Sequence, residues 1–351
     1  MKKILDNISI RYIGLRLLWG IPVLLAVVVT SFIVLRFTPG GPFDREKPLP
    51  PNILKNLRTQ YRLDRPMLPV YMMPEDQKEK EEILAFEKKH GAFAVGPVHL
   101  SIRGTLETQL FSYLGQLAKG DLGVSMKFTQ VSVNDIIKRT FPVSLTLGLL
   151  AFFLAFLIGI ILGTAAAYYQ NSWLDRAVML FSAFGFSMPN FVLAAGLIFL
   201  FSLKAHIFPP ALWEGPLYWV LPVVTLALAP ASYIARLTRS GVIESLHEDF
   251  IRTARAKGVS EKMILLKHAL VNALGPLITI GGPLLAMLVT GSFIIELVFS
   301  IPGMGRYFVT AVIDRDYPLV MGVTVVYASF IVIANIAVDV LYGIIDPRVE
   351  V

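Results

Sequence analysis

Residues 248–276 read EDFIRTARAKGVSEKMILLKHALVNALGP. This charged stretch lies between two apolar runs, each long enough to cross the hydrocarbon core of a bilayer, which is about 30 Å thick. Glu248 and Asp249 place acids at the start of a first short helix, and Gly258 ends it. Ser260 is then a candidate N-cap for a second helix over Glu261–Leu270. We expect these two helices to form a compact basic knob on one side of a membrane.

The composition of this stretch suits an interface with another protein. Ala254 and Ala256 are small enough to allow a close approach. Arg252, Arg255 and Lys257 can pair with acidic groups on a partner. The sequence therefore predicts a docking element.

The composition of the whole chain indicates a membrane protein. Of its 351 residues 55% are hydrophobic and its mean hydropathy is +0.65, whereas soluble domains lie nearer 45–50% apolar. The absence of cysteine excludes disulfides, thiolate metal sites and a cysteine nucleophile. The net charge of +7 could suggest nucleic acid, but its distribution favours membrane topology instead.

Six apolar runs predict six spans, which puts both chain ends on the same side. The first, 17–35, could be a cleavable signal peptide, but it is longer than such a region and ends in RFTPGGP. We therefore predict a retained span over 17–37. The six runs are Leu17–Leu35, Val143–Tyr169, Ala177–Leu203, Leu217–Ile234, Leu274–Phe299 and Leu319–Ile345.

The basic residues orient these spans. The predicted inner loops hold thirteen Lys and Arg residues, whereas the short outer loops 204–216 and 300–318 hold three. This is the positive-inside pattern, so both termini are expected in the cytoplasm. The inner loops are 1–16, 170–176, 235–273 and 346–351.

Residues 38–139 are expected to form an external domain. Pro74-Glu75-Asp76 is a helix start, the charges over Lys78–Lys89 alternate in sign, and Gly91 supplies a stop. This pattern predicts one solvated helix. The domain could be a lid or could hold a ligand, and the pattern favours the lid.

Two predicted spans carry helix-breaking residues. Met188-Pro189-Asn190 interrupts the third, and the fifth holds two prolines and two adjacent glycines. Proline removes a backbone donor, so we expect these helices to bend or open locally, either along a translocation path or as kinks that only fit neighbouring helices. The candidate path residues are Ser187, Pro189, Asn190, Thr279, Gly281, Gly282 and Pro283.

Other polar and small residues in the spans favour packing roles. Gly159 and Gly163 form a GxxxG pair, which lets two helices approach closely. Asp339 and Glu296 lie near the ends of their spans, so we expect each to reach an interface or to pair with an arginine.

Signatures of catalysis are missing from the sequence. It contains no GxxxxGK[ST], no HExxH and no GxSxG, and its five histidines lack metal-ligand spacing. We therefore assign no catalytic residue, no cofactor and no metal site, and expect a transport pathway that takes its energy from elsewhere. A passive channel or secondary transporter would need charges near mid-bilayer, and an intramembrane enzyme would need paired catalytic groups.

Several stretches resemble a known family. RTARAKGVSEKMILLKHALVNALGP resembles the EAA loop of ABC-transporter permeases, in the form found in first-subunit dipeptide and oligopeptide permeases. The resemblance covers most of 9–71 and 113–348; 72–112 looks like an insertion. Arg252-Thr253-Ala254 replace the consensus Glu-Ala-Ala, and His268 and Val271 replace Ile and Pro. The other matching stretches are FTPGGPFD, KGDLGVSMKFTQVSVNDIIKRTFPVSLTLG, FSIPGMGRYFVTAVIDRDYPLVMG and the terminal DPRV.

The resemblance implies an all-α polytopic protein with the six-helix type I ABC importer fold, whose five-helix core spans 140–345. It implies a bacterial cytoplasmic membrane, a second permease subunit, two cytoplasmic ATPases, an extracytoplasmic binding protein, membrane lipid around the spans and no nucleic acid. Peptides are the implied cargo, with nickel chelates or other peptide-like solutes as the alternative. Gly258 would be a turn that no larger side chain fits. The implied ATPase-coupling residues are Glu248, Asp249, Arg252, Thr253, Ala254, Arg255, Ala256, Lys257 and Gly258.

Overall fold

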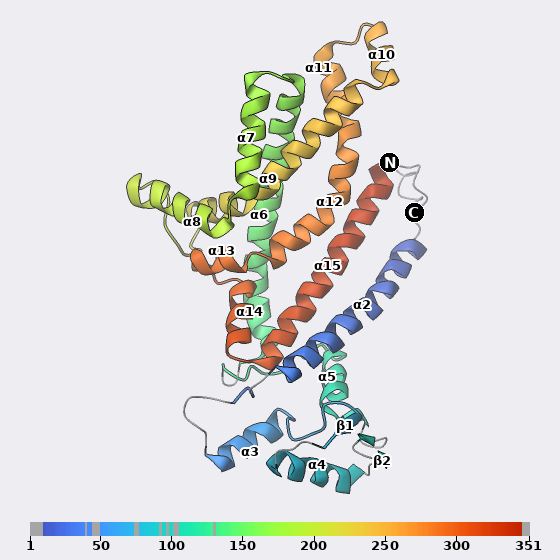
Figure 1. Ribbon diagram of the computed structural model, residues 1–351, viewed down its shortest axis with the longest axis vertical. Helices are drawn as coiled ribbons and strands as arrows, with labels where there is room; N and C mark the ends of the chain where they lie inside the picture. The colour runs from blue at the N-terminus through green and yellow to red at the C-terminus, as the bar shows by residue number, and fades with distance from the viewer. Residues whose placement is uncertain are drawn as a thin grey trace. The chain divides into compact units, whose positions relative to one another are not determined.

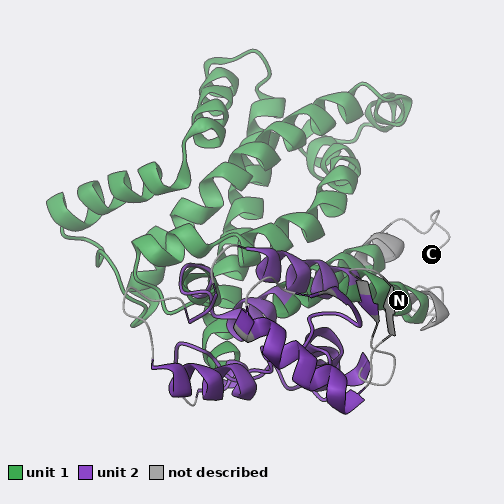
Figure 2. Ribbon diagram, turned by 60° about the horizontal axis from the view of Figure 1, so that its bottom comes forward, with its two compact units in different colours: residues 1–25, 136–310, 325–351 green, residues 26–135, 311–324 purple. Residues whose placement is uncertain are grey.

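The computed structural model describes residues 10–38, 41–43, 50–73, 77–90, 93–95, 98–100, 105–128 and 131–345. The chain divides into two compact units, coloured separately in Figure 2. Unit 1 comprises residues 1–25, 136–310 and 325–351, and unit 2 comprises residues 26–135 and 311–324.

Long apolar helices dominate the fold, as the sequence predicted. Within the residues that the structure describes, five helical segments are long and apolar enough to cross a membrane, and a bent pair makes a sixth if it counts as one span. The five are α2 (Ile10–Phe37), α6 (Val133–Tyr168), α9 (Pro216–Leu246), the run of α11 (Glu261–Met263), α12 (Leu270–Thr290) and α13 (Phe293–Val298), and α15 (Tyr317–Ile345). A shorter apolar helix, α14 (Met304–Ile313), precedes α15.

The bent pair confirms the predicted interruption of the third span. Helix α7 (Trp173–Ser187) ends before Pro189, and α8 (Asn190–Leu197) begins after it at an angle of 108° (Figure 1). Met188 adopts φ −81° and ψ 124°, because the ring of a following proline disfavours the helical region. A π-helical stretch over Ile198–Lys204 then continues α8.

The fifth span differs from the prediction. Helix α12 stays helical through both Pro276 and Pro283, so the predicted alternative of local opening is wrong, while the alternative of a bend agrees with the change of direction of α12 in Figure 1. The irregular backbone lies on either side, as a π-helical stretch over Ile264–Ala269 and a break at Gly291-Ser292. Neighbouring helices support α12: a Cβ on Gly282 would lie 3.1 Å from the carbonyl oxygen of Ala334 in α15.

Unit 1 is organised around α9, which packs against α7, α8 and α12 (Figure 1). Helix α6 also meets α9 closely. A Cβ on Gly159 would lie 2.6 Å from Cβ of Ile234, and one on Gly163 would lie 2.4 Å from the carbonyl oxygen of Ala235. The predicted close approach at the GxxxG pair is therefore confirmed.

The helical connection between α9 and α12 is shorter than the predicted 235–273 loop. Helix α9 continues to Leu246, and the predicted second helix over 261–270 is present as α11 and the π-helical stretch that leads into α12. Residues 247–260 remain between them and hold one helix, α10 (Asp249–Ala256). Apolar residues such as Val242 and Ile264, both fully buried, extend the packed helices beyond the predicted span ends.

Unit 2 contains more structure than the single predicted helix. It has α3 (Pro51–Gln60), α4 (Gln77–His90) and α5 (Gln109–Leu117), with β1 (Val70–Met72), β2 (Phe93–Val95) and β3 (Val98–Leu100). The strands form an antiparallel sheet in the order β1-β3-β2. Three-residue strands are too short to show a clear alternation, so the small sheet was not predicted.

Helix α4 is also not fully solvated. Ile83 and Phe86 are 9% and 8% exposed, and their spacing of three residues places both on one helical face. The predicted helical region over Lys78–Lys89 is confirmed, but the start at Pro74-Glu75-Asp76 and the stop at Gly91 lie outside the described residues.

We predict that Gly163→Leu destabilises the protein by about 1–3 kcal/mol or more, because the added side chain would collide with the backbone of α9. Thermal unfolding of the purified full chain in detergent measures the effect. Gly196→Leu is the matched control, since a Cβ there meets no atom within 4 Å. Equal losses in the two variants would refute the close contact.

Candidate functional site

Helix α10 is anchored to unit 1 by its inner face. Ile251 is fully buried and Ala254 is 7% exposed. Both lie in an apolar cluster with Val242 from α9 and Ile264 from the π-helical stretch. The helix is therefore held against the ends of two spans.

The outer face of α10 carries most of the predicted coupling residues. Glu248, Asp249, Arg252, Thr253, Arg255, Ala256, Lys257 and Gly258 are all exposed. Ala254 is the exception: it packs inward, so its small side chain serves contact with the chain itself. The predicted role of Ala254 in a partner's approach stays a prediction.

The C-terminal end of α10 is closed by a Schellman motif. The N–H of Gly258 donates to the carbonyl oxygen of Arg255 at 2.9 Å, and the N–H of Val259 donates to that of Ala254 at 3.2 Å. This pattern needs a left-handed residue after the helix, and Gly258 has φ +75°. Val259 adds the apolar contact with the cluster that contains Ala254.

Gly258 is thus required for its backbone conformation. Within the chain itself, a Cβ at this position would meet nothing within 4 Å, so the expectation that no larger side chain fits against a partner stays a prediction. The constraint is the positive φ, which costs an L-residue roughly 1–2 kcal/mol.

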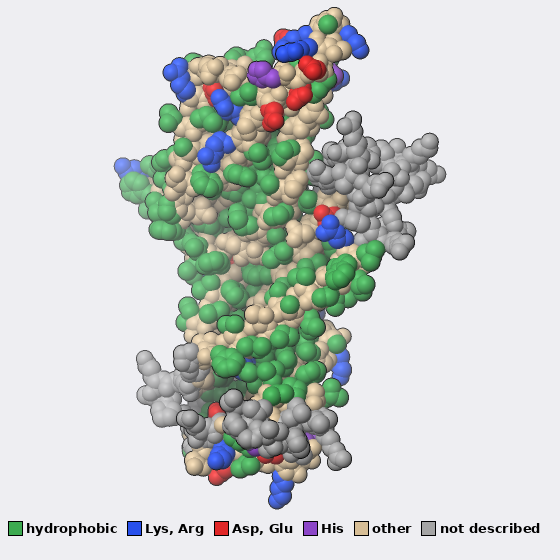
Figure 3. All heavy atoms as spheres, turned by 45° about the vertical axis from the view of Figure 1, so that its right-hand side comes forward, with side chains coloured by type: hydrophobic (Ala, Val, Ile, Leu, Met, Phe, Trp, Pro, Cys, Tyr) green, Lys and Arg blue, Asp and Glu red, His purple; other side chains and the backbone are tan. Residues whose placement is uncertain are grey.

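Charged groups gather at this end of unit 1 (Figure 3). The Arg255 guanidinium donates to both carboxylate oxygens of Glu261, at 2.8 and 3.2 Å. This hydrogen-bonded pair raises the pKa of Arg255. Arg252 lies 3.4 Å from Asp249. Arg255 therefore already has an acidic partner within the chain. The predicted N-cap residue Ser260 precedes α11, but its side chain makes no capping hydrogen bond.

The structure divides the predicted path residues into two groups. Pro189, Ser187, Thr279 and Pro283 are exposed and Asn190 is half-buried. Gly281 and Gly282 are buried in helix packing. Helices α7 and α12 each pack on α9, which runs between them in Figure 1. A path shared by the third and fifth spans thus stays a prediction.

A fully buried carboxyl group is the strongest polar feature inside unit 1. Glu296 in α13 is 0% exposed. Its Oε1 accepts hydrogen bonds from the hydroxyls of Ser144 at 2.6 Å and Ser292 at 2.7 Å, and its Oε2 accepts from the backbone N–H of Arg306 at 2.9 Å. Ser144 in turn accepts from the N–H of Met304 at 2.8 Å. These bonds join α6, α13 and the start of α14.

Glycine makes room for this group. A Cβ on Gly303 would lie 2.4 Å from Cδ of Glu296. Both predicted alternatives are wrong for Glu296: the side chain is fully buried and does not reach an interface, and its partners are two serine hydroxyls and a backbone N–H instead of an arginine side chain. Sequence reasoning missed the network because Ser144 lies 152 residues away. For Asp339 the pairing is confirmed, since Arg16 lies 3.0 Å from it.

The comparisons with known proteins agree with one another. Residues 155–351 match the family described as binding-protein-dependent transport system inner membrane components. The dipeptide transport system permease protein DppB of Bacillus subtilis is 39% identical over 95% of this chain and 96% of its own length. The oligopeptide transport system permease protein OppB of Haemophilus influenzae is 39% identical over 97% and 99%.

A solved structure shares the fold. The inward-facing MetNI methionine ABC transporter aligns with a TM-score of 0.50 at 19% identity, over 60% of this chain and 96% of that chain.

We predict that Glu296→Gln lowers the free energy of unfolding by about 1–3 kcal/mol. Both carboxylate oxygens of Glu296 accept hydrogen bonds, whereas the NH₂ group of a glutamine would replace one of these acceptors with a donor that faces another donor. Thermal unfolding of the full chain in detergent tests this. Glu244→Gln, at an exposed position of α9, should change stability by less than about 0.5 kcal/mol. An unchanged melting temperature for Glu296→Gln would contradict the network.

Proposed function

This chain belongs to the binding-protein-dependent transport system inner membrane components, and from that premise we propose that it is one of two permease subunits of an ATP-driven peptide importer. An extracytoplasmic binding protein delivers the solute. Two separate ATPase subunits supply the energy. In this proposal both termini lie in the cytoplasm of a bacterial cell and α10 faces the same side.

The observation that carries the proposal is that α10 has one buried face and one exposed face. Its inner face is fixed by Ile251 and Ala254, while its outer face exposes charged and small residues. A helix held this way can receive a push without detaching from the spans. We assign it as the element that seats on an ATPase, with the eight exposed residues named above as its contact surface.

The apolar cluster that anchors α10 also connects it to two of the membrane spans. Val242 belongs to α9, and Ile264, Ala269 and Ala273 lead into α12. Because the side chains are closely packed, a displacement of α10 moves both helices rather than compressing the contact. ATP-driven closure of the ATPases would in this way reorient the fourth and fifth spans.

One face of α12 suits half of a translocation path. Pro276, Thr279 and Pro283 are exposed, and spacings of three and four place them on the same helical face. Gly281 and Gly282 lie on the buried side. We propose that the exposed face, with Thr279 as a polar group, meets the second permease subunit across the path.

Peptides are the cargo we propose. Support comes from the relatives, which are named dipeptide and oligopeptide transport system permease proteins. The binding protein would select among peptides, and this chain would admit what it releases.

We predict that cells lacking this chain lose uptake of a labelled dipeptide or tripeptide, and that the chain isolated in mild detergent retains a second permease and ATPases with Walker motifs. Mass spectrometry of the isolated complex identifies these subunits. Retained ATPases with unchanged peptide uptake would refute the cargo, whereas recovery of the chain without any ATPase would refute the importer.

The turn at Gly258 permits a graded test of coupling. We predict that transport falls in the order Gly258→Asn, Gly258→Ala, Gly258→Val, because tolerance of positive φ falls in that order. Transport and ATPase activity are measured together in proteoliposomes of the assembled complex. Gly275→Ala, where a Cβ meets nothing within 4 Å, is the control. Full transport in Gly258→Val would remove the coupling role.

A further inference from the structure

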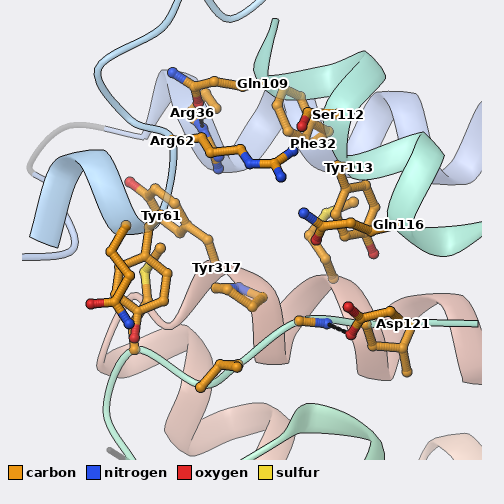
Figure 4. Close-up of a pocket in the computed structure, with 17 residues that line it drawn as sticks. Phe32, Arg36, Tyr61, Arg62, Gln109, Ser112, Tyr113, Gln116, Asp121 and Tyr317 are labelled. Atoms are coloured by element: carbon orange, nitrogen blue, oxygen red, sulfur yellow. Dashed lines mark hydrogen bonds between the residues drawn. The ribbon is translucent and has the colours of Figure 1, made fainter. Parts of the chain in front are cut away.

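Unit 2 contains a cavity that the proposed function does not use. Its volume is about 240 Å³. Side chains from the end of α2, from α5 and from the start of α15 converge on it (Figure 4). Because ligand pockets for drug-sized molecules run from roughly 300 Å³ upward, this one suits a ligand about the size of an amino acid.

Arg36 supplies a fixed positive charge at the cavity. Its guanidinium lies 4.5 Å from the ring centre of Phe32 and 4.6 Å from that of Tyr317. Its Nε donates to Oε1 of Gln109 at 2.8 Å, and Nε2 of Gln109 is held in turn by the carbonyl oxygen of Arg65 at 2.6 Å. The stacking and the bond from Nε fix the plane of the guanidinium.

The described residues give Arg36 no carboxylate partner. Asp316, next to Tyr317, is occupied by the hydroxyl of Ser125 and by the N–H groups of Met126 and Leu319. Asp121 is the one acid among the described lining residues, and it lies across the cavity from Arg36 in Figure 4. The terminal nitrogens of Arg36 are thus available to a ligand.

A second donor at the cavity lacks a partner. The hydroxyl oxygen of Tyr113 is buried and makes no hydrogen bond within the described part of the chain. Burial raises the pKa of Tyr113, so the hydroxyl keeps its proton and can donate. Buried polar groups are nearly always paired in folded proteins, which makes an unpaired hydroxyl on a cavity wall a sign of a missing acceptor.

Two further groups favour an anion. Arg62 also lines the cavity and lies on the side of Arg36 in Figure 4. Gln116 adds an amide, which can donate. Phe32 and Met321 are among the apolar side chains that line the wall. Two guanidinium groups and a phenol face a small space with apolar sides.

We propose that this cavity binds the carboxylate of a small organic solute, such as an amino acid or the C-terminal residue of a short peptide. A guanidinium presents two parallel N–H groups that match the two oxygens of a carboxylate. The Tyr113 hydroxyl donates to the same group, and the apolar wall contacts the carbon skeleton. The site does not depend on the proposed function, because binding to unit 2 requires neither an ATPase nor transport.

The experiment uses the full chain in lipid nanodiscs and titration calorimetry. The probes are N-acetylalanine and N-acetylalaninamide, which differ at the carboxylate. We expect the acid to bind at least tenfold more tightly than the amide. Equal affinities, or no binding of the acid, would overturn the proposal. Inorganic phosphate binding as tightly as the acid would instead indicate a general anion site and also overturn it.

Three variants locate the binding. Arg36→Gln should weaken N-acetylalanine at least tenfold. Tyr113→Phe should weaken it severalfold without lowering the melting temperature, because the lost hydroxyl has no described partner. Lys119→Gln removes the same charge from an exposed position outside the cavity and should leave affinity unchanged. Wild-type affinity in both Arg36→Gln and Tyr113→Phe would place the ligand elsewhere and refute the site.

Discussion

The close contact of α6 with α9 is the constraint on which unit 1 depends. Lipid tails are as apolar as leucine, so helices in a membrane gain little from hiding apolar side chains and associate through fit instead. At Gly159 and Gly163 the absent side chains let the two helices touch through Ile234 and the carbonyl oxygen of Ala235. Helix α9, which is held in this way, also packs against α7, α8 and α12.

The position of α10 follows from the same helix. Because α9 extends to Leu246 without a break, α10 docks on its end through Ile251. The Schellman turn at Gly258 then directs the chain into α11 over two residues. In the proposed coupling role, this short connection between packed helices would transmit a displacement that a flexible loop would absorb. The backbone conformation of one glycine therefore matters more here than the space around it.

The features that sequence predicted are those with local causes. Apolar runs located the spans, Pro189 located the break in the third, and Gly258 located the end of α10. The features it missed depend on partners distant in sequence. Glu296 looked peripheral because Ser144, which buries and binds it, lies on another span. Ile83 and Phe86 were hidden among alternating charges, and only the fold of unit 2 shows what they pack against.

Proline acted differently in the two interrupted spans, and its surroundings explain why. Pro189 follows Met188, whose extended backbone ends α7. The first residues of α8 are mostly exposed, so few packing contacts oppose the break between the two helices. Pro276 and Pro283 lie on the exposed side of α12, while the opposite side packs through Gly282 against α15. A missing backbone donor on one face costs a helix little when the other face is held. A proline removes the helical donor for the carbonyl group four residues before it, and in α12 both prolines lie on the exposed side of the helix.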